Sequence, residues 1–419
     1  MEIILEQAKL IHPGHPQHGS RLNIRIRDGK IVSLKTGKDK NARTIKGKDL
    51  HVSIGWLDLG ASVGEPGYEH RETVHSLTLA ARDGGYTGVA VLPNTKPPLH
   101  SKAEIEFISR KSHAADIDIY PIGAISKGNQ GKELAEMIDM HTSGAIAFSD
   151  GLFPVQDNGV MLRAMMYVNH FNGLIINNPE DLATASLGQM HEGIVSQQLG
   201  LKGIPSIAES LMLQRDLYLA GYAGCRYLAH LVSTEESVKQ FKVARKNLRS
   251  AFSSVSYLNL LLNDTSLNGF DSNFKQSPPL RTERDRKALI QGVKQKVIDL
   301  VCSNHRPLEV EKKDLEFAYA DPGTIGLQTA YAALATESVL DPEEWVTAVA
   351  FNSRQVLNLA LPEIAVGSAA NLTIFDSEEE WEFGPDRLKS LSKNTPFAGR
   401  RFKGRVLATL HKNSAYLNN

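Results

Sequence analysis

The stretch SIGWLDLGASVGEPGYEHRET, residues 53–73, contains the pattern from which the fold can be predicted. Its apolar run Gly55–Leu59 predicts a buried strand, because the run is short and is followed by glycine and proline. A helical pattern follows at Thr73–Arg82, and a second apolar run follows at Gly88–Leu92. We therefore predict a strand, a helix and a second strand in succession.

The same alternation continues through the middle of the chain. Six further apolar runs predict strands at Ile117–Ile122, Gly144–Phe148, Gly173–Ile176, Arg226–Ala229, Leu248–Phe252 and Val297–Val301. Helical patterns between them include Lys102–Ser112, Ile207–Ala220 and Arg284–Lys296. Eight alternating strands and helices favour an α/β fold, a (β/α)₈ TIM-type barrel over residues 53–359. A doubly wound sheet is the alternative, but no glycine-rich dinucleotide motif follows the first strand.

Both ends of the chain have strand character. Apolar or alternating runs lie near the start at Ile3–Ala8, Leu22–Arg27 and Ile31–Leu34, and near the end at Asn371–Phe375 and Arg405–His411. We predict that residues 1–52 and 360–419 together form a small β-sandwich domain.

The composition narrows the class of protein. Lys+Arg and Asp+Glu both number 47, so no net charge favours nucleic acid or an anionic membrane. Cys225 and Cys302 are the only cysteines, which excludes a disulfide framework and fits a reducing compartment. The first residues do not resemble a signal peptide, and no apolar run is long enough to span a membrane. We expect a cytoplasmic protein of enzyme-like size.

In a (β/α)₈ barrel the chemistry lies where the strands end. The polar residues at these positions include Ser62, Asn94, Asp150, Asn177, Asn178, His230, Asn304 and His305. A hydrolytic metal site requires at least three histidine or carboxylate ligands, and only Asp150, His230 and His305 are candidates. The alternative is that these side chains bind neighbouring backbone groups.

Two other groups of residues are weaker candidates. His12, His15 and His18 lie in IHPGHPQHG, where the spacing could capture a metal but proline and glycine favour a solvated turn. Cys302 precedes Asn304 and His305, as a nucleophile beside a base would, although a buried strand cysteine is the commoner case.

Eight segments, taken in order, resemble the dihydroorotase family of the amidohydrolase superfamily. Residues 53–73 resemble the signature PGFIDLHVHLREPGxEHKET. The others are VAVLPNTKPP (89–98), AFSDGLFPVQD (147–157), INNPED (176–181), LAHLVST (228–234), SPPLR (277–281) and CSNHRPL (302–308), and SKNTPFAGRRFKGRVLATL (392–410) resembles the C-terminal signature. The match runs from about residue 1 to 415, and it implies the barrel and the β-sandwich domain.

The resemblance also implies a zinc site, and this sequence departs from the family at most of its ligands. Two metal-binding histidines after the first strand are replaced by Gly60 and Ser62, and a third histidine is replaced by Asn178. His230 stands at a surviving ligand position, and Asp150 at the carboxylate expected after the fourth strand. Since zinc affinity comes from several such ligands together, we expect no zinc cofactor.

The groups that act on the substrate are also altered. Asn304 replaces the aspartate that serves as general base, and an amide does not titrate usefully. Gly64 replaces the arginine that binds the substrate carboxylate, and Ser277 replaces an asparagine. Asn94 remains at the substrate-binding asparagine. No catalytic residue is intact, so the resemblance implies a pseudoenzyme.

Three functions follow as hypotheses. The first is a non-catalytic dihydroorotase homologue of pyrimidine biosynthesis, because some inactive chains of this family assemble with aspartate carbamoyltransferase; a homodimer is also expected. The second is a residual or metal-independent cyclic-amide hydrolase that uses Asp150, His230 and His305. The third is a small-molecule binding module with pocket residues Asn94, Asn177, Asn178 and Arg281.

Overall fold

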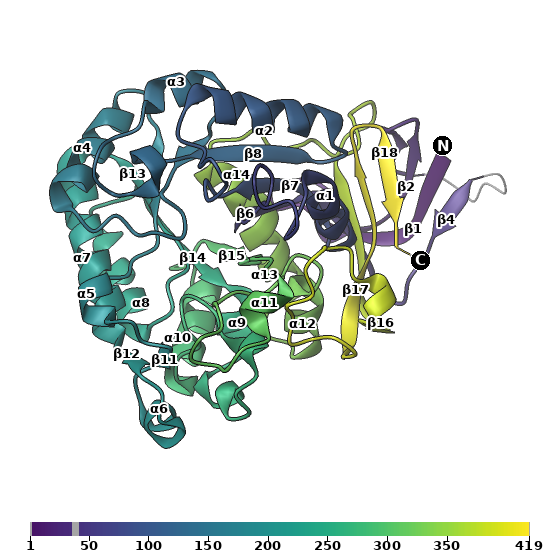
Figure 1. The fold of residues 1–419 in the computed structure, drawn as a ribbon. Helices are drawn as coiled ribbons and strands as arrows, with labels where there is room; N and C mark the ends of the chain where they lie inside the picture. The colour runs from purple at the N-terminus through teal and green to yellow at the C-terminus, as the bar shows by residue number, and fades with distance from the viewer. Residues whose placement is uncertain (1, 36–41, 419) are drawn as a thin grey trace.

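The computed structural model describes residues 2–35 and 42–418. Its central feature is a sheet of eight parallel strands in the order β6 to β15 (Figure 1). The strands are β6 (Trp56–Ala61), β7 (Tyr86–Val91), β8 (Asp118–Gly123), β9 (Ala147–Phe148), β10 (Leu174–Asn177), β13 (Arg226–Ala229), β14 (Ala251–Ser256) and β15 (Leu300–Cys302). This confirms the predicted eight-stranded α/β barrel.

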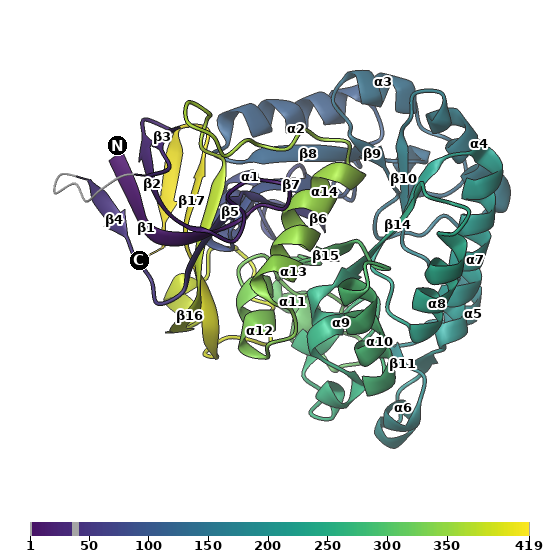
Figure 2. The ribbon, with the colours of Figure 1, turned by 180° about the vertical axis from the view of Figure 1, so that it is seen from behind.

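Helices cover the outside of this sheet (Figures 1 and 2). The longer ones are α1 (Val74–Asp83), α2 (Lys102–Ala114), α4 (Asn158–Asn169), α7 (Ser206–Ala223), α8 (Glu235–Ala244) and α10 (Glu283–Lys294). Shorter helices are α3 (Met137–Thr142), α9 (Tyr257–Leu261), α11 (Val310–Lys313), α12 (Ala330–Thr336), α13 (Pro342–Val346) and α14 (Asn352–Val356). None of the described helices is long and apolar enough to cross a membrane.

A buried carboxylate and a backbone hydrogen bond connect the first and last strands of the barrel. The carboxylate of Asp58 accepts hydrogen bonds from the backbone N–H and the hydroxyl of Ser303, both at 2.7 Å. The Ser62 N–H donates to the carbonyl of His305 at 2.8 Å. Burial raises the pKa of Asp58 to about 6, although the bonds from Ser303 oppose that shift. A buried carboxylate with two donors therefore adds to the backbone hydrogen bond between these two strand ends.

The interior of the barrel is a packed core and not a channel. Alternate strand residues point inward and are buried, among them Leu57, Leu59, Ala90, Ile122, Leu174, Ile176, Leu228 and Leu300. Residues on the opposite faces pack against the helices. The near-continuous apolar runs in the sequence reflect this burial on both faces.

The two ends of the chain form a second, β-rich unit that contains both termini (Figure 1). Its sheet has the order β18-β17-β16-β5-β1-β2-β3, and β4 also pairs with β1. The strands are β1 (Glu2–Ile11), β2 (Arg21–Arg27), β3 (Lys30–Ser33), β4 (Arg43–Ile45), β5 (Leu50–Ile54), β16 (Leu372–Glu382), β17 (Arg401–His411) and β18 (Ser414–Leu417). The pairing of β5 with β16 joins the termini, as predicted; the exact domain boundaries stay a prediction.

Several strand bounds differ from the sequence expectation. The fourth strand is Ala147–Phe148 and not Gly144–Phe148, and the eighth is Leu300–Cys302 and not Val297–Val301. The seventh strand is Ala251–Ser256 and not Leu248–Phe252, because its second half is made of buried serines that an apolar pattern does not reveal. The connection from β10 to α7 carries an additional excursion (Figure 2). It contains α5 (Leu182–Ala185), β11 (Met190–His191), α6 (Ile194–Leu199) and β12 (Gly203–Ile204).

Candidate functional site

His230 follows β13 at the carboxyl end of the barrel and is buried. Its Nδ1 lies 3.0 Å from the hydroxyl of Ser254, and its Nε2 has no hydrogen-bond partner in the described part of the chain. Nε2 faces the backbone of Gly60, where a Cβ would be only 2.4 Å away. Burial lowers the pKa of His230 to about 3, so the ring is neutral near pH 7.

The carboxylate of Asp150 is hydrogen-bonded within the barrel and does not face an open site. Its carboxylate accepts hydrogen bonds from the backbone N–H of Ser126, at 2.8 Å, and from the Ser126 hydroxyl. Burial raises the pKa of Asp150 to about 6, and the bonds from Ser126 act in the opposite direction. With only 1% of its surface exposed, this carboxylate positions a loop.

Asn94 joins the second and fourth strand ends. Its amide nitrogen donates to the carbonyl of Asp150 at 3.1 Å, and its oxygen accepts from the N–H of Leu152 at 3.0 Å. A Cβ on Gly151, which has a φ of +62°, would lie 1.9 Å from that oxygen. Both polar atoms of Asn94 are therefore used within the protein.

The other amides at the strand ends also have protein partners. Asn177 donates to Asp216 at 2.8 Å and accepts from the N–H of Val155 at 3.2 Å. Asn304 donates to the carbonyl of Ser277 at 3.1 Å and has a φ of +47°. Asn178 is half-buried beside Asn177. These contacts join loops at the carboxyl end of the barrel.

Arg281 is the centre of a buried charge network. Its guanidinium donates to the hydroxyl of Ser233 at 3.0 Å and to the carbonyl of Ile204 at 2.8 Å, and it lies 3.7 Å from Glu209. Glu209 also accepts hydrogen bonds from Ser233, Thr234 and Ser237. Arg281 is therefore committed to the protein and is not presented to a ligand.

His305 binds a second buried carboxylate. Its Nε2 lies 3.2 Å from Glu72, and its Nδ1 accepts from the N–H of Gly326 at 3.2 Å. Glu72 is fully buried and also accepts from the hydroxyl of Ser390. This network connects the last barrel strand, the loop before α1 and the C-terminal segment.

The three residues of the hydrolase hypothesis do not form a group. Asp150 pairs with Ser126, His230 with Ser254, and His305 with Glu72, and no hydrogen bond joins any two of Asp150, His230 and His305. The alternative expectation was hydrogen bonding to neighbouring backbone groups. Asp150 and His305 each contact a backbone N–H, of Ser126 and Gly326, whereas His230 contacts the hydroxyl of Ser254. The expectation of an open pocket around the three is not met in the described residues.

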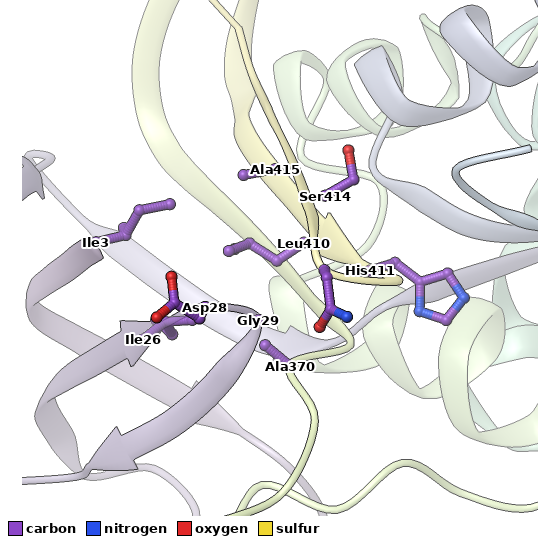
Figure 3. Close-up of a pocket in the computed structure, with 10 residues that line it drawn as sticks. Ile3, Ile26, Asp28, Gly29, Ala370, Leu410, His411, Ser414 and Ala415 are labelled. Carbon is purple, nitrogen blue, oxygen red and sulfur yellow. The ribbon is translucent and has the colours of Figure 1, made fainter. Parts of the chain in front are cut away.

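Two cavities are informative about the site. One encloses about 50 Å³ at the carboxyl end of the barrel, between Ser62, Gly64, Asn94 and Arg306. The other encloses about 270 Å³ in the β-rich unit, between β1, β2 and the β17–β18 hairpin (Figure 3). In the latter, His411 pairs with Asp118 at 2.9 Å and the lining is mixed polar and apolar, so it shows no catalytic grouping.

Comparison with known proteins gives a consistent result. The family model described as dihydro-orotase-like matches residues 51–237. The dihydroorotase of Anaeromyxobacter dehalogenans is 36% identical over 417 residues, which cover 97% of this chain and 96% of that protein. That of Pelotomaculum thermopropionicum is 38% identical over 393 residues, which cover 92% and 91%. This chain belongs to the dihydroorotase family.

Solved structures support the fold of this dihydroorotase-family chain. The L-hydantoinase (dihydropyrimidinase) from Arthrobacter aurescens has a TM-score of 0.86 at 20% identity and covers 99% of this chain and 96% of its own. A dihydropyrimidinase from Brevibacillus agri has a TM-score of 0.82 at 17% identity and covers 100% and 95%. At these identities the likeness concerns the fold.

The residues present do not fit the zinc site of the dihydroorotase family. No group of three or more His, Cys, Asp or Glu that could hold a metal is found in residues 2–35 and 42–418. At the positions where the resemblance places ligands, Gly60 has no donor atom and Asn178 offers a neutral amide. Asp150 is bound by Ser126. The mismatch with the family's zinc site therefore lies in which ligand atoms these residues offer.

The histidine loop near the N-terminus is a turn. The N–H of His12 donates to Nδ1 of His18 at 3.2 Å, and the N–H of Gln17 donates to Nδ1 of His15 at 3.0 Å. His18 also lies 3.4 Å from Glu343. These contacts fit the turn that the proline and glycine residues of this segment predict, and not a metal site.

Several residues of this region were not identified from the sequence. Ser126, Glu72 and Glu209 contact Asp150, His305 and Arg281, respectively. Glu72 and Glu209 do not follow a predicted strand directly, whereas Ser126 lies four residues after the predicted strand Ile117–Ile122. Arg306 could have been identified from the sequence, because it directly follows His305 at the end of the eighth strand.

Proposed function

We propose that this chain is a non-catalytic dihydroorotase homologue of pyrimidine biosynthesis that acts as a structural or regulatory partner of aspartate carbamoyltransferase. The observation that carries the proposal is the contact between His230 and Gly60. The only histidine kept at a family ligand position packs where a side chain at residue 60 would begin. The space for a neighbouring ligand is therefore absent.

The groups that would act on a substrate support the same proposal. Asn304 donates its amide hydrogen to the carbonyl of Ser277 and cannot serve as a general base. At Gly64, a Cβ would lie 2.2 Å from the carbonyl of Tyr68, so the loop leaves no room for an arginine side chain. Since metal, base and carboxylate anchor each contribute orders of magnitude to such a reaction, their joint loss favours a non-catalytic role.

A turnover assay tests the catalytic part of this proposal. We expect the purified chain at high concentration to hydrolyse dihydroorotate, or to cyclise carbamoyl-aspartate, at least ~10⁴-fold below the roughly 10 per second of a typical enzyme. Added zinc should not change this rate. The dihydroorotase of Anaeromyxobacter dehalogenans is the positive control. Zinc-dependent turnover near the typical rate would overturn the non-catalytic assignment.

A surface groove between α7 and α8 supports the partner part of the proposal. The groove encloses about 810 Å³ and is lined by Leu217, Tyr218, Tyr222 and Val243, among others. Tyr218 is 77% exposed and Tyr222 is 73% exposed. Tyrosines are enriched at protein interfaces, and large exposed apolar patches mark interaction sites.

Co-purification from the native host tests the partner. We expect aspartate carbamoyltransferase to co-purify with the unaltered chain and to be lost with the double variant Tyr218→Ser/Tyr222→Ser. The control is Tyr319→Ser, which removes an equally exposed tyrosine, 74%, outside the groove. Sedimentation velocity of the isolated chain tests the expected homodimer. Recovery of the unaltered chain without any carbamoyltransferase would refute this partner.

A further inference from the structure

Helix α7 lies at the outer edge of the molecule beside α8 (Figures 1 and 2). Its exposed positions have one feature in common, because none of them carries a charge. They are Ile207, Leu211, Gln214, Tyr218, Gly221 and Tyr222. Helix α10, which packs on α8, shows the usual pattern, because three of its four exposed positions are Arg284, Lys287 and Lys294. An uncharged outer face with large apolar side chains is typical of a helix that a partner covers.

Four large side chains form a stripe along this face. Ile207 and Leu211 are about half exposed, and Tyr218 and Tyr222 are about three-quarters exposed. They follow one another after four, seven and four residues, so they lie in one line along an α-helix. Such a line of apolar and aromatic side chains is the pattern by which one helix packs against another.

The stripe is symmetric about the middle of the helix. Ile207 and Tyr222 are equally distant from the point just after Gln214. Leu211 and Tyr218 are also equally distant from that point. Two copies of α7 packed antiparallel about a two-fold axis there would place each aliphatic side chain opposite a tyrosine of the other copy. A two-fold interface requires a surface that complements itself in this way.

The groove between α7 and α8 fits the same arrangement. Its volume is about 810 Å³, and its α7 side is formed by the second half of the helix, from Gln214 to Tyr222. Val243 of α8 lies on the opposite side. In the antiparallel arrangement, Ile207 and Leu211 of one copy lie over the groove of the other. Each copy therefore supplies both the inserted side chains and the groove that receives them.

The residues beside the stripe do not oppose a close approach. Arg215, next to the midpoint, is only 15% exposed and is ion-paired with Asp216 at 2.6 Å. It therefore does not place an unpaired positive charge at the axis. Gly221 has nothing within 4 Å of its Cβ position, so it leaves open space on the exposed face. The absence of a side chain there allows another backbone to come near.

We propose that this face of α7 binds the same face of a second copy of this chain, with the two helices antiparallel about an axis beside Gln214. Burial of the four large side chains supplies the affinity. The two Gln214 amides meet at the axis and can hydrogen-bond to each other, as a buried amide fixes the register of a coiled coil. The proposal goes beyond the proposed function and needs no carbamoyltransferase. A carbamoyltransferase that binds at Tyr218 and Tyr222 would exclude the second copy.

Sedimentation equilibrium of the isolated full chain tests this interface. We expect a dimer for the unaltered chain. Leu211→Asp should weaken the dimer by at least ~100-fold, because each dimer would bury two carboxylates without partners. Leu315→Asp is the matched control, since Leu315 lies outside α7 and is 48% exposed, compared with 47% for Leu211. It should leave the dimer unchanged.

Cross-linking tests the antiparallel arrangement. Gln214→Cys should be joined to its own copy across the axis by a bismaleimide of about 10 Å span, since packed helix axes lie about 8–10 Å apart. The native thiols of Cys225 and Cys302 are buried and should not compete. The control is Gln355→Cys, at an exposed glutamine of α14, which should give no cross-linked dimer.

A monomeric unaltered chain, or an unchanged dimer in Leu211→Asp, would overturn the interface. Absence of the cross-link in Gln214→Cys, or equal cross-linking in Gln355→Cys, would overturn the antiparallel pairing. If Leu211→Asp fails to fold, the cross-link decides the matter, because it needs only a change at an exposed glutamine. These measurements require neither turnover nor a carbamoyltransferase. A monomeric chain that still co-purifies with the transferase would refute this pairing and leave the proposed function standing.

Discussion

A Cβ at residue 60 would lie 2.4 Å from Nε2 of His230, because the imidazole packs directly against the backbone of Gly60. Gly60 also has a φ of +91°, a backbone conformation that residues other than glycine rarely adopt. The backbone at Gly60 and the imidazole of His230 thus fit closely against each other. Restoring a histidine at residue 60 alone would therefore displace His230 and not rebuild a metal site.

Substitution of Gly60 tests this packing. We expect Gly60→Ala to lower the free energy of unfolding by about 1–3 kcal/mol more than Gly367→Ala, because overpacking adds to the backbone strain. Gly367 is the matched control, since it has a φ of +96° and nothing within 4 Å of its Cβ position. Urea denaturation provides the comparison, and His230→Ala in the Gly60→Ala background should recover part of the loss. Equal losses at the two glycines would contradict the contact.

The pH dependence of stability should report the buried His230. Burial lowers the pKa of His230 in the folded protein to about 3 from its ordinary value of 6.5, so the unfolded chain binds a proton first on acidification. The contribution of the neutral, buried His230 to the free energy of unfolding is fully present above pH 6.5. It is lost as the pH falls toward 3, by about 1.4 kcal/mol per pH unit. Asp58 and Asp150 act in the opposite direction, because their pKa values are raised to about 6.

The histidine contribution can be isolated by comparing slopes. Between pH 6 and about 4, the unfolding free energy of His230→Asn should fall less steeply with decreasing pH than that of the unaltered chain, by about one proton. The carboxylates are present in both proteins and cancel. His170→Asn, at an exposed histidine, should keep the original slope. Parallel slopes for His230→Asn and the unaltered chain would mean that His230 is not buried in its neutral form.

The network around Arg281 should be important for stability and not for binding. Arg281→Met leaves the buried carboxylate of Glu209 without its cation, and we expect a loss of about 3 kcal/mol or more. Arg284→Met is the control, because that side chain is 76% exposed and its pairing with Glu235 is worth less than about 1 kcal/mol. Chemical denaturation measures both. A loss below 1 kcal/mol for Arg281→Met would show that its charge is not needed there.

The buried carboxylate of Glu72 should tie three segments together. Glu72→Gln places an amide hydrogen where the oxygen accepts from Ser390 or His305, so we expect a loss of about 1–3 kcal/mol. The exposed Glu311→Gln should change stability by less than about 0.5 kcal/mol. Hydrogen exchange should also quicken in the segment around Ser390. An unchanged exchange rate there would indicate that Glu72 does not hold that segment.

The sequence was sufficient for the barrel because most of its strands are buried on both faces and read as apolar runs. The sequence was insufficient where the buried strand residues are polar. Ser253, Ser254 and Ser256 lie in β14 with no exposed surface. Ser253 contacts Asp299 and Ser254 contacts His230, and both partners are distant in sequence. Such a strand has no apolar period to recognise, so its predicted position was displaced toward Leu248.

The sequence by itself determined the family, the order of the strands and the loss of donor atoms at Gly60, Asn178 and Asn304, because these depend only on residue type and order. The tertiary structure alone decided what the surviving polar groups do. Asp150 and His305 were ligand or base candidates until their contacts with Ser126 and Glu72 were known. Hydrogen-bond partners and enclosure depend on segments that only folding brings together.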